Sequence, residues 1–150
     1  MIPSDHFVRF YNEIFKYLDE RDALQGYYDT IVEKQKDFYL ELFSTQGLQG
    51  MYDYWSRIKV EENCVMDLEI ADDCFTLTMN ECPSLSKVIN NDAGPCEKYC
   101  DHCPGWVVPL IEGAGYVCEY NMISRTIPKC QFKVYPKSSG KKTRIFMEEL

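Results

Sequence analysis

The segment VMDLEIADDCFTLTM, at residues 65–79, decides the fold of this chain. Its apolar residues Met66, Leu68 and Ile70 alternate with other residues, which is the period of two expected of a half-buried β-strand. Asp72 then falls in a turn, and the alternation resumes at Phe75. The segment therefore predicts a β-hairpin with one face on an apolar core.

A second pair of alternating segments lies further along the chain, at residues 116–123 and 129–135. The turn between them contains Pro128, so this stretch predicts a second hairpin. With a helix between the two hairpins, residues 61–136 form a ββαββ region. This order of elements predicts a four-stranded antiparallel sheet, built from two hairpins that flank a central helix.

The stretch between the hairpins favours helices. Residues 83–89 can form a short helix, and residues 106–112 favour a longer one with Pro104 in its first turn. Gly113 closes that helix, whereas Pro109 inside it carries the risk of a kink. We expect the longer helix to be the central helix of the ββαββ region.

The N-terminal part is rich in aromatic residues that recur at helical spacing. We expect a first helix from about residue 5, a second over residues 23–43 and a third over residues 51–58. Gly47 and Gly50 flank the break between the last two. The aromatic stripes of these helices would pack on the sheet.

The chain has 150 residues, enough for one domain with a substantial core. We therefore predict a single α+β domain over residues 1–150. Its helical front spans residues 1–60, and a basic, solvated tail spans residues 137–150.

Composition and charge exclude several classes of function. The net charge of −8 argues against a nucleic-acid groove, which needs a clustered basic face. The sequence shows no signal peptide and no apolar run of the ~20 residues needed to cross a bilayer. We expect a cytoplasmic protein that binds neither nucleic acid nor membrane. The sequence is compatible with a homo-oligomer.

In that reducing compartment the eight cysteines would be metal ligands, reactive thiols or core residues, whereas export would favour a disulfide such as Cys118–Cys130.

The segment PCEKYCDHCPG, at residues 95–105, is the candidate functional site, because it gathers three cysteines and a histidine within eight residues. The two cysteines of Cys100-x2-Cys103 have the spacing of a zinc ligand pair. Cys96 and Cys82 are candidates to complete the set. One interpretation is therefore a zinc ion held by Cys82, Cys96, Cys100 and Cys103.

A nucleophilic cysteine is the second interpretation. Cys103 would lie at a helix N-terminus, where unpaired backbone N–H groups and the helix dipole favour a thiolate. His102 and Asp101 adjoin it, and a general base could equally come from the N-terminal helices, where the only other histidine is His6.

Two other interpretations remain. The spacing Cys96-x3-Cys100-x2-Cys103 also occurs in iron–sulfur loops, although 150 residues with this strand order cannot supply a radical-SAM barrel. The cysteines could also be small core residues with no chemical role.

From about Cys82 to Tyr135 the sequence resembles the L-2-amino-thiazoline-4-carboxylic acid hydrolase-like family. The resemblance rests on Cys82-Pro, on the motif YCDHC at residues 99–103 before an apolar helix, and on KCQF at residues 129–132. The order of elements is also similar to 4-vinyl-reductase ligand-binding domains.

The resemblance implies a hydrolase that acts on carbon–nitrogen bonds of a small cyclic substrate. In that case Cys103 or Cys100 would be the reactive or metal-holding thiol, and Asp101 and His102 would polarise the substrate or a water molecule. The 4-vinyl-reductase likeness implies instead a zinc-containing ligand-binding or sensing domain without catalysis. The sequence does not decide between the two, but both predict a small-molecule ligand.

Overall fold

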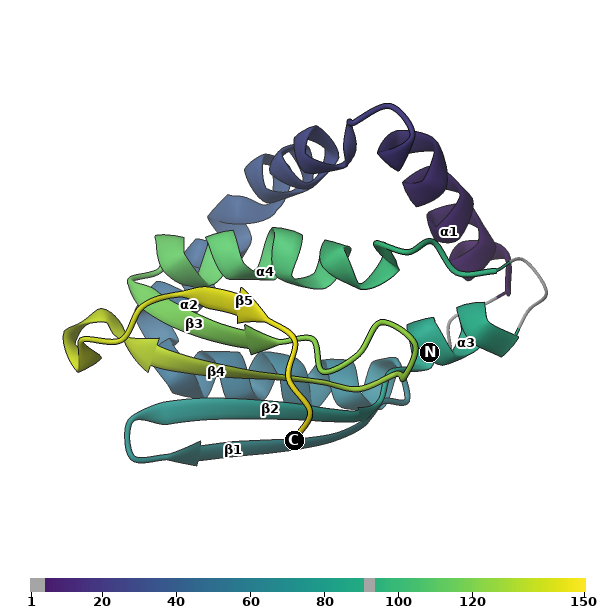
Figure 1. Ribbon diagram of the computed structural model, residues 1–150. Helices are drawn as coiled ribbons and strands as arrows, with labels where there is room; N and C mark the ends of the chain where they lie inside the picture. Colours follow the sequence, from purple (N-terminus) through teal and green to yellow (C-terminus); the bar gives the residue numbers. More distant parts are fainter. Residues whose placement is uncertain (1–4, 91–93) are drawn as a thin grey trace.

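The computed structural model describes residues 5–90 and 94–150. Two helices, α2 and α4, cover one face of a mixed sheet, and α1 and α3 lie toward one end of it (Figure 1). In chain order the elements are α1 (Asp5–Asp19), α2 (Leu24–Glu61), β1 (Val65–Ala71), β2 (Cys74–Glu81), α3 (Pro83–Asn90), the 3-10 helix η1 (Tyr99–Asp101), α4 (His102–Gly113), β3 (Tyr116–Asn121), β4 (Cys130–Pro136), the 3-10 helix η2 (Lys137–Ser139) and β5 (Arg144–Phe146).

The sheet has five strands in the order β1-β2-β4-β3-β5. The predicted α+β class and both hairpins are confirmed, because β1 pairs antiparallel with β2 and β3 antiparallel with β4. The predicted four-stranded antiparallel sheet is wrong, since β5 adds a fifth strand parallel to β3. At the other edge, β1 leaves Val65 and Ile70 exposed.

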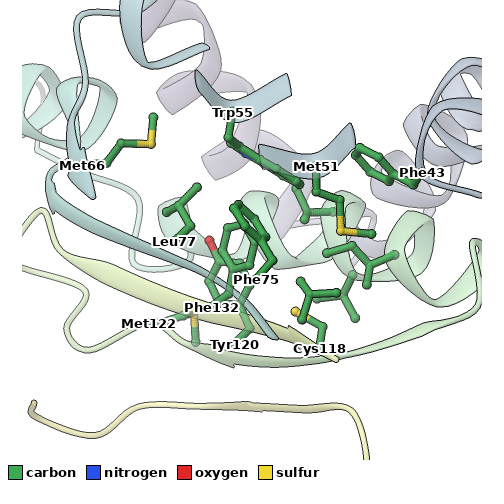
Figure 2. Packing of buried hydrophobic residues seen from close by; sticks show 14 residues of the cluster. Phe43, Met51, Trp55, Met66, Phe75, Leu77, Cys118, Tyr120, Met122 and Phe132 are labelled. Carbon is green, nitrogen blue, oxygen red and sulfur yellow. The ribbon is translucent and has the colours of Figure 1, made fainter. Parts of the chain in front are cut away.

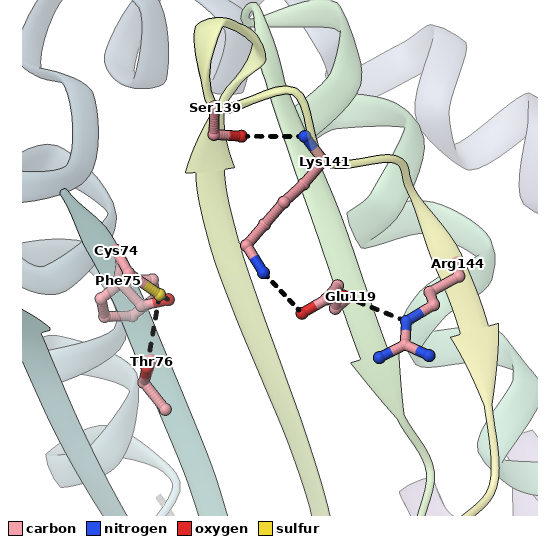
Figure 3. A network of polar contacts seen from close by, with 7 residues as sticks. All are labelled: Cys74, Phe75, Thr76, Glu119, Ser139, Lys141 and Arg144. Atoms are coloured by element: carbon pink, nitrogen blue, oxygen red, sulfur yellow. Dashed lines mark hydrogen bonds and ion pairs between the residues drawn. The ribbon is translucent and has the colours of Figure 1, made fainter. Parts of the chain in front are cut away.

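The strand β5 comes from the segment that was expected to be a solvated tail. Its basic residues are used to attach it to the sheet (Figure 3). The Glu119 carboxylate on β3 pairs with Arg144 at 3.1 Å and with Lys141 at 3.9 Å. The buried Asn121 side chain accepts the N–H of Glu148 at 2.9 Å and donates to its carbonyl at 2.8 Å. These partners are more than twenty residues apart in the sequence, so local patterning does not reveal them.

The long helix α2 is broken at Gly47, as the glycine pattern predicted. Gly47 has φ 61° and ψ −145°, a backbone conformation that is essentially restricted to glycine. A Cβ atom there would also lie 2.9 Å from the Tyr116 hydroxyl. The break lets the second half of α2, which carries Met51 and Trp55, lie against the sheet.

Gly47→Ala is therefore expected to lower the free energy of unfolding by about 1–3 kcal/mol, measured by urea denaturation. Gly26→Ala is the matched control, because Gly26 lies in α2 with nothing within 4 Å of its added methyl group. We expect that control to stabilise the protein by about 0.5–1 kcal/mol. Equal effects of the two substitutions would contradict the assignment of strain to Gly47.

The core lies between α2, α4 and the sheet and is built around aromatic rings (Figure 2). Trp55 stacks on Phe75 with ring centroids 5.6 Å apart, and its other ring neighbours include Phe43 at 5.6 Å and Phe132 at 5.1 Å. Tyr120 stacks on Phe132 at 5.4 Å. The core thus joins the aromatic helices to both hairpins.

A second apolar cluster lies where α1, α3 and the start of α2 meet the cysteine segment. Its buried members are Val8, Phe15, Leu24, Tyr28, Leu85, Val88, Cys96 and Tyr99. This cluster packs around the cysteine segment, which the sequence indicates as the candidate functional site. Among the helices of the described residues, none combines the length and the apolar character needed to cross a membrane.

Candidate functional site

The loop that leads into the cysteine segment is anchored by Asn12 of α1, which is 1% exposed. Its amide oxygen accepts the backbone N–H of Cys96 at 2.8 Å, and its amide nitrogen donates to the Gly94 carbonyl at 2.9 Å. Further along, the Tyr99 hydroxyl of η1 lies 2.7 Å from the Ser84 hydroxyl of α3. The segment is therefore held by α1, which is distant in the sequence, and by α3, which precedes it.

The central helix α4 begins at His102, four residues before the predicted start at residue 106. Cys103 therefore lies in its first turn, as expected. Pro109 does not interrupt the helix, which continues to Gly113. The exposed position of Pro109 leaves room for its ring on the solvent side.

His102 and Cys103 contact each other although they are sequence neighbours. The Cys103 Sγ lies 3.3 Å from Nε2 of His102, and Nδ1 of the same ring faces the Tyr99 carbonyl. Because a carbonyl only accepts, Nδ1 carries the proton and Nε2 has a free lone pair. The thiol of Cys103 can therefore donate to Nε2, which is the geometry of a thiol and its general base.

Burial works against a reactive thiolate at this position. It raises the pKa of Cys103 to about 11, and a hydrogen bond from Tyr120 only partly opposes this effect. Burial also lowers the pKa of His102, so the imidazole is neutral. Sequence reasoning expected the helix N-terminus to lower the pKa of Cys103, but desolvation has the larger effect here. His6 lies exposed on α1 and lines a separate groove there.

Four thiols beside the start of α4 lie close enough for their charges to interact, and we call them the thiol cluster: Cys82, Cys100, Cys103 and Cys130. Cys64 interacts in the same way with Cys82 and Cys103. Burial raises the pKa of Cys82 to about 11 and of Cys100 to about 12, with repulsion from neighbouring thiolates as a further cause. The pKa of Cys130 is raised in the same way, first by burial and then by the other three thiols. Every pair within the cluster is thus close enough for its charges to interact.

Cys96 is not part of the thiol cluster. It is buried in the second apolar cluster, and the causes that raise its pKa, burial first, include no other cysteine. Cys130 joins instead, from the start of β4. Within residues 5–90 and 94–150, no three His, Cys, Asp or Glu side chains are arranged to hold a metal ion as they stand.

Asp101 does not face Cys103 but forms an ion pair with Arg125, whose Nη1 lies 2.6 Å from Oδ1. Both residues line a cleft of about 430 Å³ between the α1–α2 turn and the start of α4. Lys98 and Asp19 form a second ion pair there, at 2.6 Å. The described residues that line the cleft are Asp19, Asp22, Leu24, Gln25, Tyr28, Lys98, Asp101, Pro104, Gly105, Met122, Arg125 and Ile145, and none of them is a cysteine.

Tyr28 is the one aromatic residue in that lining. Its side chain is 4% exposed, and its hydroxyl is buried with no hydrogen-bond partner among the described residues. A Cβ atom on Gly105 would come within 2.6 Å of its ring, so the ring lies directly on the first turn of α4. A buried hydroxyl without a partner is costly, which marks this end of the cleft as a place for a ligand or a rearrangement.

No protein-family model, curated protein or solved structure matches this chain. The function of the site is therefore inferred from its own geometry and chemistry.

Proposed function

We propose that this domain binds a small organic molecule with both a cationic and an anionic group in the cleft beside the start of α4. The observation that carries the proposal is the lining, in which Asp19, Asp22 and Asp101 face the same space as Lys98 and Arg125. Such paired charges can exchange an internal partner for a ligand group of the same sign. The volume of about 430 Å³ suits a small molecule.

The reaction that we propose for this ligand is hydrolysis of a carbon–nitrogen bond in a small ring. Cys103 would pass its proton to His102 Nε2 and attack the ring carbon, and His102 would return the proton to the leaving nitrogen. Neither Cys103 nor His102 lines the cleft, so this reaction requires the ligand to reach past Pro104, the residue of α4 that follows Cys103 and does line it. Water would then release the product and restore the thiol. The 3.3 Å contact between Cys103 and His102 supports this proposal.

All eight cysteines are free, which suits a reducing compartment such as the cytoplasm.

The first test uses 2-aminothiazoline-4-carboxylate, which carries a carboxylate and a basic ring nitrogen. We expect calorimetry to show saturable binding to the wild-type chain and at least about tenfold weaker binding to Asp101→Asn, the equivalent of 1.4 kcal/mol. Lys36→Met is the control, because Lys36 lies exposed on α2, where it pairs with Glu33 at 2.8 Å, and it does not line the cleft. If Asp101→Asn bound the compound as tightly as the wild-type chain, the cleft would not be the binding site.

Turnover of the same compound separates catalysis from binding. If the domain is a hydrolase, Cys103→Ser should abolish product formation while the calorimetric affinity stays within a fewfold of wild type. Product formation at the wild-type rate in that variant would rule out Cys103 as the nucleophile.

The second candidate function is a zinc-containing ligand-binding or sensing domain without catalysis. The observation that favours it is that three more thiols, Cys82, Cys100 and Cys130, lie close enough to Cys103 for their charges to interact. A protonated nucleophile reacts slowly, whereas a cluster of thiols is suited to a metal. Binding of the compound without turnover would favour this candidate.

A further inference from the structure

The helix α1, at one end of the molecule, has two apolar faces (Figure 1). Val8 and Phe15 lie on the inner face and are buried in the second apolar cluster. A second apolar stripe recurs along the helix at spacings of three and four residues, which places its members on one face. We call it the outer stripe, and it consists of Phe7, Phe10, Ile14 and Tyr17.

The aromatic rings of the outer stripe are largely exposed. Phe7 and Phe10 are each 62% exposed, and Tyr17 is 53% exposed although the Arg21 guanidinium lies over its ring, 3.6 Å from the centroid. Ile14 is half-buried between the two faces. Large apolar side chains that are exposed side by side mark a surface for association.

We propose that the outer stripe is the interface of a homodimer, in which α1 of one copy packs antiparallel against α1 of a second copy. The same surface of both copies would then meet about a twofold axis. With that axis at the level of residue 12, Phe7 lies against Tyr17 of the second copy, and Phe10 lies against its Ile14. This inference does not depend on the ligand in the cleft or on the cysteines.

The charges beside the outer stripe are complementary to those of a second copy in this arrangement. Arg9 and Glu13 lie one turn apart on the same flank of the stripe, where both line a groove with Phe10. An antiparallel pair brings these flanks together with their order reversed, so Arg9 faces Glu13 of the second copy, and the opposite contact also forms. Glu13 already accepts from Lys16 at 3.0 Å, and a carboxylate can accept a second cation.

A parallel pair would not make this match. It would place the flank of Arg9 and Glu13 against the other flank of the second copy's stripe, where Tyr11 and Leu18 offer no charge. The dipoles of two parallel helices also repel each other, whereas those of antiparallel helices attract. Charge therefore selects the antiparallel arrangement.

The exposed apolar area sets the expected strength of the dimer. An aromatic side chain has about 200 Å² to bury, so three rings that are each more than half exposed offer roughly 350 Å² per copy. Stable complexes bury about 800 Å² per partner. We therefore expect a weak dimer that dissociates in the micromolar range, and not an obligate one.

The first test measures the mass of the full chain by sedimentation over a range of micromolar concentrations. We expect the average mass to rise with concentration from the 17.6 kDa of one chain toward that of two. Phe10→Asp should weaken association at least about tenfold, because it buries a charge in the interface. Phe38→Asp is the matched control, since Phe38 is 58% exposed on α2 and should leave association unchanged.

The second test reverses the charges of the proposed pair. Arg9→Glu and Glu13→Arg should each associate more weakly than the wild-type chain, because like charges then meet twice across the axis. An equimolar mixture of the two variants should associate again, since each introduced charge then faces an opposite one on the other chain. Lys36→Glu and Glu33→Lys make the same charge changes on α2 and should associate as the wild-type chain does, alone and mixed.

Three outcomes would overturn the proposal. The first is a wild-type chain that stays monomeric over the whole range, in which case the outer stripe serves a different partner. The second is association of Phe10→Asp equal to that of the wild-type chain, which would place the interface elsewhere. The third is a mixture of Arg9→Glu and Glu13→Arg that associates no better than either variant alone, which would exclude the antiparallel arrangement.

Discussion

Phe75→Ala is expected to lower the free energy of unfolding by about 3–5 kcal/mol, the largest effect of any substitution considered for this chain. Phe75 is 0% exposed and lies in the middle of the core, where its ring contacts Trp55, Phe132 and Tyr52. Its loss would leave a cavity between α2 and the sheet that these rings cannot fill. Urea denaturation followed by circular dichroism measures the change.

Phe75→Leu provides the control for that experiment. It keeps most of the apolar volume and should cost less than half as much, because smaller cavities cost less. If leucine and alanine gave the same loss, the stability of the core would not depend on the volume at this position.

The second large effect is expected at Asn12. Asn12→Ala should lower the free energy of unfolding by about 2–4 kcal/mol, because an orphaned buried donor costs roughly 1–3 kcal/mol and the vacated space adds to it. The donor is the backbone N–H of Cys96, which is buried and bonds to the Asn12 side chain. Hydrogen exchange should also become faster at Cys96, because the loop loses its attachment to α1.

The control for this experiment is Asn80→Ala. The Asn80 amide donates to Asp67 at 2.8 Å in an exposed contact, so its loss should cost less than about 0.5 kcal/mol. Unchanged exchange at Cys96 in Asn12→Ala would show that other contacts hold the loop.

The elements that the sequence predicts well are those with a local cause. Alternation predicted the strands of both hairpins, and Gly47 predicted the break in α2 because few other residues accept its backbone conformation. The strand β5 could not be found in this way. It has only three residues, and it is held by Glu119 and Asn121 on a strand that precedes it by more than twenty residues.

The candidate site shows the same limit. Sequence spacing correctly put Cys103 in the first turn of a helix, but it also suggested that Cys96 would act with it. The spacing of the cysteines did not predict that the Cys96 backbone N–H would bond to the Asn12 side chain on α1. Nor did it predict that the start of β4 would bring Cys130 to Tyr120. Both placements depend on tertiary packing, for which a single cysteine or asparagine carries no local signal.

In the part of the chain that the structure describes, no strand pairs with the outer edge of β1, and this affects how the molecules behave at high concentration. An unpaired strand edge is a template for aggregation, and the exposed Val65 and Ile70 would add to the hazard. Asp67 and Glu69 lie between these two residues along β1 and are also exposed, so edge-to-edge docking of two copies would crowd carboxylates of like charge. The protein thus protects its edge by repulsion, and added salt would screen that protection.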